Sequence, residues 1–440
     1  MVAKQDPGGE SARGLALEDG GRIHLSGSRV RVAAIGIASP GYKASGGISA
    51  SLQLTRSVAD HCEAGMYIMS DRDQDAVDGR LRIAYRRPGN AVSSIASMLP
   101  RQLVTMMWRP KLGEWLRDFA PDVVHLHNPH PPGALALAAR TCDSMGIPYV
   151  ISTHGFVEFN DFSRGYGAPL WQRPLLERLV RKPVVEVARG AARVLMLSPY
   201  EESILRGMGV AHDRLRIVPN GVDRYFLEPP AEAERDRLVA RFELPRGAPL
   251  LLFVGNPTVN KGLDVLLRAL PMMRERAVAI IAGAIRSRAE NEKLILSSGL
   301  ELTDPRFRFT DYVTREELRS LYHSVDAFVF PSRADTLPLV ILEAMAAGLP
   351  VVASNIGGIP YQVTADEGFL VPSGEPAELA RALDLVCRDP TMRGRMGASG
   401  RRRVLEHFDW AASTALAVKI YEDVARQALT SRNGRDASVA

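Results

Sequence analysis

Cysteine is scarce in this chain, and the few cysteines stand far apart. Cys62, Cys142 and Cys387 are the only cysteines among 440 residues, and none of them forms a C-x-x-C pair. This spacing argues against a cysteine-based metal site and against a disulfide framework. Isolated cysteines suit a reducing compartment, so we expect a cytoplasmic location.

Long apolar runs are also missing. No stretch approaches the roughly twenty apolar residues that cross a bilayer, so no transmembrane helix is predicted. Residues 1–28 lack the apolar core of a signal peptide and are rich in glycine, serine and charge. We expect them, and the similar residues 429–440, to form flexible tails.

Three functional patterns have little or no support. The loop after the first predicted strand, residues 29–38, has no G-x-G-x-x-G, which counts against a nicotinamide-dependent dehydrogenase. Residues 71–75, DRDQD, contain an Asp-x-Asp triplet, but we interpret this polar segment as a solvated turn and assign no metal. The net charge is only +5 and basic residues do not alternate with aromatics, so no nucleic acid partner is predicted.

What the chain does contain is one arrangement that occurs twice. The apolar strand at 29–38 leads through a glycine-rich loop, which ends at Gly46-Gly47, into a helix. The apolar strand at 251–255 leads through the loop 256–261 into another helix, without repeating the first sequence. Strand, loop and helix in this order open a nucleotide-binding parallel sheet. We therefore expect an α/β protein with two Rossmann-like domains, for which the chain is long enough.

The most informative stretch is PSRADTLPLVILEAMAAGLPVVASNIGGIP, residues 331–360. It follows an apolar strand, and it places Asp335 in a polar loop and Glu343 inside the next predicted helix, residues 339–347. The free N–H groups of a helix that follows a parallel strand attract phosphate. A carboxylate beside them would repel phosphate, but it accepts hydrogen bonds from sugar hydroxyls. The stretch therefore predicts a phosphate next to a polyol, as in a nucleotide-sugar.

This stretch resembles the signature of the family 4 glycosyltransferases, which are retaining enzymes of the GT-B fold. The family pattern places an acidic residue, then seven residues, then Glu within PS…E…P…EAMA.G.PVVA…GG, and this chain has Asp335 where Glu is usual. The resemblance covers roughly residues 30–428. It implies a cleft between the two Rossmann-like domains and a C-terminal helix that crosses back to the first domain.

The resemblance also suggests domain boundaries. We expect an N-terminal acceptor domain at 29–222, a C-terminal nucleotide-sugar donor domain at 223–407 and a returning helix at 408–428. The family motif PNGVD stands at the first boundary, where Asn220-Gly221 suits an inter-domain turn.

Several donor-binding residues follow from the resemblance. Lys261 would stabilise the leaving diphosphate, together with N–H groups near Leu339. Asp335 would contact hydroxyls of the donor sugar, and Glu343 would bind the ribose hydroxyls. Backbone around Tyr312-Val313 would lie against the nucleotide base.

Glycines and histidines complete the implied site. Gly357 and Gly358 would bring backbone close to the donor. Gly46 and Gly47 match a glycine pair of the family, and their alternative role is a simple tight turn. His154 matches the histidine of a family HG motif and would contact the sugar and steady the transition state. For His154, as for His127 at another strand end, an ordinary buried histidine is the alternative.

Three departures from the family pattern leave other interpretations open. Asn256 replaces the arginine of G-R-x-x-x-x-K-G, and Tyr361 replaces the glutamate of GGIPE, in addition to Asp335. Arg333 in the neighbouring loop is a candidate to supply the missing charge. A non-catalytic scaffold that binds sugar nucleotides remains an alternative, as does another GT-B enzyme such as a sugar-nucleotide epimerase.

The function implied by the resemblance is a retaining, metal-independent hexosyltransferase of cell-surface polysaccharide synthesis. The donor would be a UDP- or GDP-linked sugar, the acceptor a glycan or a lipid-linked glycan, and no cofactor is expected. Basic segments at 101–117 and 173–189 suggest peripheral contact with anionic lipid at the inner membrane face. The alternative for the second segment is a half-buried helix pair interrupted by Pro183.

Overall fold

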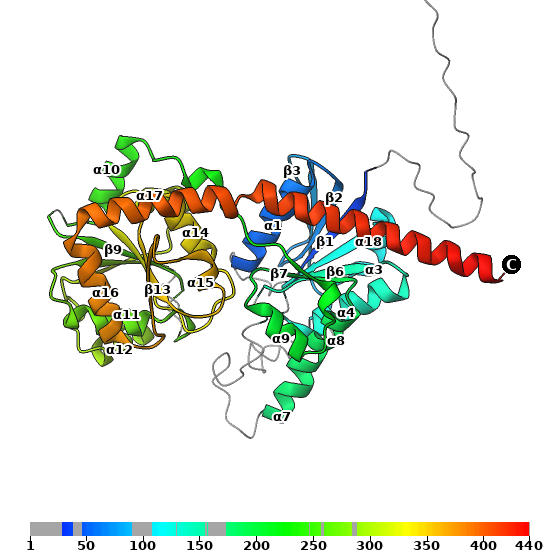
Figure 1. The fold of residues 1–440 in the computed structure, drawn as a ribbon, viewed down its shortest axis with the longest axis horizontal. Coiled ribbons are helices and arrows are strands. Elements are labelled where there is room, and N and C mark those ends of the chain that lie inside the picture. Colours follow the sequence, from blue (N-terminus) through cyan, green and yellow to red (C-terminus); the bar gives the residue numbers. More distant parts are fainter. Residues whose placement is uncertain are drawn as a thin grey trace, which may run out of the picture.

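The computed structural model describes residues 29–37, 46–89, 108–128, 130–154, 156, 173–245, 247–256, 259–283 and 288–439. The predicted tail at 1–28 and residues 101–107 of the basic segment at 101–117 lie outside these ranges. The described residues form two α/β domains, each built on its own sheet, and a long C-terminal helix lies along the first domain (Figure 1). This arrangement confirms the predicted fold class.

The first sheet has the strand order β3-β4-β2-β1-β5-β6-β7-β8 and is parallel except for the antiparallel pair β3 and β4. Its strands are β1 (Arg31–Gly36), β2 (Glu63–Met69), β3 (Gln74–Asp78), β4 (Leu81–Arg86), β5 (Val123–His127), β6 (Tyr149–Ser152), β7 (Arg193–Met196) and β8 (Leu215–Ile217). Its helical segments are α1 (Gly46–Val58), α3 (Leu112–Phe119), α4 (Pro132–Ser144), α7 (Arg173–Leu176), η3 (Glu177–Arg181), α8 (Lys182–Gly190), α9 (Glu201–Gly207) and η4 (His212–Arg214).

Both faces of the first sheet are buried, which is why its strands read as continuous apolar runs in the sequence. Along β1, Ala33 and Ile35 pack with α3, α4 and α8, whereas Val32 and Ala34 point to the opposite face. That opposite face is covered by α1 and by the C-terminal helix α18 (Trp410–Val439). The first domain therefore takes part of its core from the far end of the chain.

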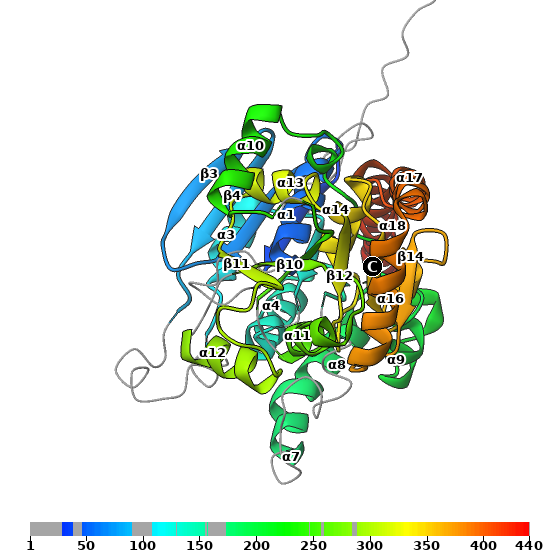
Figure 2. The same cartoon turned by 90° about the vertical axis from the view of Figure 1, so that its left-hand side faces the viewer.

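The second sheet has six parallel strands in the order β11-β10-β9-β12-β13-β14. Its strands are β9 (Leu250–Val254), β10 (Val278–Ala282), β11 (Phe307–Asp311), β12 (Ala327–Phe330), β13 (Val351–Ser354) and β14 (Gly368–Val371). Its helical segments are η5 (Arg224–Phe226), α10 (Glu232–Arg241), η6 (Val259–Lys261), α11 (Leu263–Ala269), η7 (Leu270–Met272), α12 (Arg288–Ser297), α13 (Arg315–Tyr322), α14 (Leu339–Ala346), α15 (Ile359–Gln362), α16 (Pro376–Arg388) and α17 (Pro390–His407). Figure 2 shows this domain facing the viewer. The helices α13 and α14 lie above its strands, α11 and α12 lie below them, and α16 lies to their right.

The chain crosses between the domains twice, and the two crossings are bonded to each other. Val222 donates its N–H to the carbonyl of Phe408 at 2.7 Å, and a side chain at Gly221 would overlap Trp410. The helix α17 packs on α14 of the second domain, and α18 packs on α1 of the first (Figure 1). The domain boundary at 222 stays a prediction, and it lies in this double crossing.

Three local predictions differ from the structure. Gln74 and Asp75, at the end of the turn predicted for 71–75, belong to β3, because their backbone pairs antiparallel with β4. Pro183 does not interrupt its helix, because the preceding π-turn η3 bonds Lys182 N–H to the carbonyl of Glu177, so the chain reaches the proline without a break.

The last helix is also longer than predicted. The backbone of α18 stays helical to Val439, so residues 429–439 of the predicted tail continue the helix. A helix that packing has already nucleated extends at low cost, because each added residue gains a backbone hydrogen bond. Within the described ranges, no helix combines the length and the apolar character that a membrane crossing requires.

Candidate active site

The predicted site residues follow strands at the two places where strand order reverses. In the second sheet β9 pairs with both β10 and β12, so the loops after β9 and β12 leave the sheet in diverging directions. In the first sheet β1 has the same position between β2 and β5. Such switch points open a crevice at the carboxyl ends of the strands, where ligands of parallel sheets bind.

Lys261 and Asp335 meet at the switch point of the second sheet. The Lys261 Nζ lies 2.7 Å from the Asp335 Oδ2, which also accepts from the Ser332 hydroxyl at 2.9 Å. The two side chains remain 30% and 14% exposed, so the pair is reachable from the crevice. Gly262, at φ 69°, starts the helix after Lys261 and packs so tightly on the Pro331 carbonyl that a Cβ would overlap it. Backbone packing therefore fixes the position of the pair.

Glu343 lies in the second turn of α14, behind this pair. The Tyr322 hydroxyl donates to the Glu343 Oε2 at 3.0 Å. Burial raises the pKa of the Glu343 carboxyl to about 7, while Tyr322 and Arg315 act in the opposite direction. The residue sits where free N–H groups at the start of α14, at Leu339, face the same crevice. The segment after β12 thus carries Asp335 before the start of α14 and Glu343 within that helix, and Lys261 pairs with the first of these two carboxylates.

Gly357 and Gly358 lie against the loop that carries Asp335. A Cβ at Gly357, which has φ 54°, would come within 1.9 Å of the Asp335 carbonyl oxygen, and one at Gly358 within 1.8 Å of the Thr336 carbonyl oxygen. Any larger residue would push this loop away. The glycine pair is thus required for packing, and its approach to a donor stays a prediction.

Arg333 is engaged elsewhere than expected. Its guanidinium makes a bidentate pair with Asp264 on α11, with both N···O distances at 2.6 Å. Burial acts against ionisation of Asp264, but Arg333 and Arg268 hold the pKa of this carboxyl below its ordinary value. Asn256 is exposed at the end of β9. Arg333, proposed from the sequence to supply charge at the donor site, is therefore held by Asp264, which it shares with Arg268.

His154 and Gly47 meet at the switch point of the first sheet. A Cβ at Gly47 would lie 3.4 Å from the His154 Cβ, so the first turn of α1 passes directly over the histidine. Gly46 and Gly47 open α1 rather than a loop before it. Burial lowers the pKa of His154 to about 4, so its imidazole is neutral near pH 7. A neutral imidazole offers one hydrogen-bond donor and one acceptor, which suits a hydroxyl.

The two domains touch where these residues lie. Asn220 of the PNGVD motif donates from Nδ2 to the Leu337 carbonyl at 3.1 Å, in the loop between Asp335 and α14. The Ser198 hydroxyl lies close enough to Gly358 that a Cβ there would stand 2.9 Å from it. The loop that carries Asp335 and the glycine pair thus lie where the two domains meet.

Sequence reasoning missed one buried carboxylate. Glu201 at the start of α9 accepts from the backbone N–H groups of Leu197 and Ser198, and burial raises its pKa to about 7. The spacing Ser198-x-x-Glu201 is that of a capping box, which is the signal that would have found it.

Two other features fall outside this crevice. Asp73 accepts from the Arg87 N–H at 2.9 Å, which fits the interpretation of this triplet as a turn. Among the described residues, no group of three or more His, Cys, Asp or Glu is arranged to hold a metal ion.

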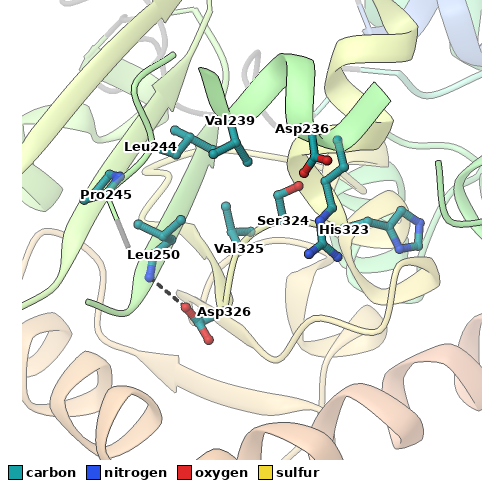
Figure 3. A pocket seen from close by; sticks show the side chains of 10 residues that line it. Asp236, Val239, Leu244, Pro245, Leu250, His323, Ser324, Val325 and Asp326 are labelled. Carbon is teal, nitrogen blue, oxygen red and sulfur yellow. Dashed lines mark hydrogen bonds between the residues drawn. The ribbon is translucent and has the colours of Figure 1, made fainter. Parts of the chain in front are cut away.

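A cavity of about 380 Å³ lies below α10, at the amino ends of β9 and β12 (Figure 3). It is at the opposite edge of the sheet from Lys261.

Comparison with known proteins agrees with this geometry. The family described as glycosyl transferases group 1 matches residues 234–403, and glycosyltransferase family 4 matches residues 67–225. A D-inositol 3-phosphate glycosyltransferase of Frankia alni is 31% identical over 343 residues, covering 71% of this chain and 80% of that protein.

Solved structures share the fold at lower identity. Sucrose-phosphate synthase from Thermosynechococcus elongatus superimposes with a TM-score of 0.74 at 23% identity, covering 90% of this chain and 99% of that one. Anabaena HepE, solved with UDP-glucose, gives a TM-score of 0.68 at 17% identity, covering 89% of this chain and 99% of that one. This chain therefore belongs to the family 4, group 1 glycosyltransferases, and it has their two-domain GT-B fold.

Proposed function

We propose that this protein transfers a hexose, with retention, from a UDP- or GDP-sugar to a glycan or lipid-linked acceptor in cell-surface polysaccharide synthesis. The observation that carries the proposal is the Lys261–Asp335 pair in front of α14, with Glu343 behind it. The solved HepE complexes contain UDP and UDP-glucose, which supports a nucleotide-sugar donor here. Each part of such a donor has a chemical counterpart in this group of residues.

The donor would be held by its charges at one end and its hydroxyls at the other. A diphosphate would draw Lys261 from Asp335 and accept from the N–H groups at Leu339. Asp335 would then be available to accept from sugar hydroxyls, while the ionised Glu343 would accept from the ribose. Asn256, Gly357 and Gly358 would border the diphosphate and the sugar, and backbone at Tyr312-Val313 would face the base.

The reaction breaks the bond between the anomeric carbon and the diphosphate oxygen. The acceptor hydroxyl oxygen forms the new bond on the same face, and its proton passes to the departing diphosphate oxygen. Lys261 and the α14 N–H groups would stabilise the developing negative charge, a task that metal ions perform in other enzymes. His154, held by Gly47, would donate to a sugar hydroxyl. We therefore propose that catalysis requires no metal ion.

Thermal stabilisation tests the donor site directly. A ligand that binds the folded state raises the unfolding temperature by mass action, so UDP, GDP, ADP and their sugars are compared on wild type and Glu343→Ala. We expect one nucleotide series to stabilise the wild type strongly and the variant weakly. No shift at millimolar ligand contradicts the proposal, and binding without transfer to any glycan acceptor favours the scaffold interpretation. Conversion of the donor sugar without an acceptor indicates an epimerase.

A lipid-linked acceptor is supported by the helix formed by α7, η3 and α8. Val180 and Val184 face α4, whereas Arg178, Leu179 and Lys182 face outward, and Leu179 is 47% exposed. A basic outer face with an exposed leucine suits the surface of an anionic membrane. Co-sedimentation with vesicles of phosphatidylglycerol and phosphatidylcholine should exceed that with phosphatidylcholine alone. The double variant Arg178→Glu, Lys182→Glu should abolish the difference, and equal sedimentation of wild type with both vesicles contradicts the contact.

A further inference from the structure

A row of buried aromatic rings connects the C-terminal helix with His154. The Tyr421 hydroxyl of α18 lies 2.7 Å from the His125 Nδ1, and the His125 Nε2 lies 2.8 Å from the Ser152 hydroxyl. The His125 and His127 ring centroids are 3.7 Å apart, and those of His127 and His154 are 6.0 Å apart with the planes 29° from parallel. All four rings are at most 8% exposed. Tyr421, 296 residues from His125 in sequence, forms the outer end of this row.

The same helix also supports the other side of His154. The first turn of α1 carries Gly47, which touches His154, and α1 packs along α18. Ala417 and Val424 of α18 share one apolar cluster with Leu54 and Val58 of α1. Gly47 on α1, and the ring of His127 on β5 that lies beside His154, therefore both belong to elements that rest on α18.

An ordinary apolar core would be more stable than this row. Both ring nitrogens of His127 are buried without a hydrogen-bond partner among the described residues. A buried polar atom without a partner lowers the stability of the folded state, so an apolar residue of similar size would avoid this penalty. Burial also lowers the pKa of His125 to about 3, so the rings are neutral and stack without repulsion. A row that lowers stability beside a ligand crevice is better explained by the position it gives to His154.

We propose that Tyr421 is a positioning residue of the active site, which holds His154 against Gly47 through His125 and His127. The proposal rests on the proposed function, because it treats His154 as a contact of the donor sugar. It gives the crossing helix a part in the transfer step beyond joining the domains. Donor binding is expected to depend little on Tyr421, because Lys261 and Glu343 lie in the other domain.

Tyr421→Phe tests the proposal, since it removes the hydroxyl and keeps the ring. We expect kcat for transfer to fall about tenfold, as small misplacements of a reacting group do, while the KM for the donor stays within about twofold. Tyr149→Phe is the matched control, because Tyr149 is equally buried in the same domain and its hydroxyl donates to the Val187 carbonyl on the other face. If both variants lower kcat alike, or if Tyr421→Phe leaves kcat unchanged, the proposal is wrong.

Ring signals of labelled histidine give a readout that needs no turnover. The chain has nine histidines, and single substitutions assign the signals of His125, His127 and His154. We expect Tyr421→Phe to shift all three, and Tyr149→Phe to shift none. A shift confined to His125 overturns the proposal even if no donor is ever found. If Tyr421→Phe shifts all three signals but the wild type binds no donor, the proposed function is wrong, while the coupling along the row of rings is supported.

Discussion

The two edges that border the crevice differ in charge. The edge of the second sheet carries Lys261, Asp335 and, behind them, Arg333 paired with Asp264. The edge of the first sheet carries neutral histidines, because burial lowers the pKa of His154 to about 4. A charged edge suits a diphosphate, and a neutral edge with donors and acceptors suits hydroxyls. From this difference we expect the two domains to bind chemically different parts of the substrate, and each of the following variants tests this expectation.

The largest effect is expected from removing the cation of the charged edge. Lys261→Met should lower kcat/KM about 10³-fold, because one preorganised charge at a leaving group contributes about that much. The measurement is steady-state transfer with the donor identified by thermal stabilisation. Arg388→Met, which removes an exposed ion pair with Glu275 at 3.1 Å in the same domain, should change kcat/KM little. Equal activities of the two variants would show that the charge of Lys261 has no special role at the charged edge.

The neutral edge should contribute less to catalysis than the charged edge, and its contribution should be to kcat rather than to nucleotide affinity. His154→Ala should lower kcat about 10²-fold, because it removes a hydrogen bond to the sugar in the transition state. The Kd for the free nucleoside diphosphate should stay within about twofold, since the nucleotide contacts the other domain. Calorimetric titration measures this Kd. A large loss of nucleotide affinity in His154→Ala would show that the division between the edges is wrong.

The pH dependence of nucleotide affinity isolates one carboxylate of the charged edge. Since the pKa of Glu343 is raised to about 7, its carboxylate forms fully only above that pH, and UDP or GDP affinity should rise by about tenfold between pH 6 and pH 8. Glu343→Gln should bind about tenfold more weakly at pH 8 and lose this part of the dependence. Glu201→Gln is the matched control, because its pKa is also raised to about 7 but it lies in the first domain.

The raised pKa of Glu343 should make the stability of the protein fall with pH, whereas it makes nucleotide affinity rise. A carboxyl whose pKa is raised in the folded state binds its proton more tightly there than in the unfolded state. The free energy of unfolding therefore falls as pH rises from the ordinary pKa of the carboxyl toward 7. The melting temperature of the wild type should therefore fall relative to that of Glu343→Gln between pH 5 and pH 8. A constant difference over this range would contradict the raised pKa.

The smallest effect is expected at Asn256, where the charged edge is weaker than the family pattern. Asn256→Arg restores that pattern and should raise nucleotide affinity about three- to tenfold, as one added charge-assisted hydrogen bond to phosphate does. Titration with the diphosphate measures the gain. Asn355→Arg, another exposed asparagine of this domain at the end of β13, is the control. No gain at Asn256 would show that Lys261 already saturates the charge the donor needs.

The sequence was sufficient for the fold class, for simple physical reasons. Strands buried on both faces, such as β9 and β12, are visible as apolar runs, and a short motif places Asp335 and Glu343 relative to a helix start. Adjacent strands then bring Lys261 to Asp335 without further information.

What the sequence could not show depends on partners distant in the chain. Arg333 looked available because nothing near it in sequence reveals its bond to Asp264, 69 residues away. β3 has no apolar signal of its own, since its mostly exposed residues pair only with β4. The contact of Tyr421 with His125 has no sequence motif, because it arises where α18 returns to the first domain.

The return of α18 to the first domain has a consequence for the order in which the two domains fold during synthesis. The second domain is complete once α17 has been made, whereas the first still lacks Tyr421 and the other α18 residues of its apolar cluster, which are Ala417, Ile420, Val424 and Ala425. Domains usually fold in the order of their synthesis. In this protein the first domain made is the last to close its core, and a ribosome-bound chain that ends at residue 407 should leave that apolar face open to chaperones.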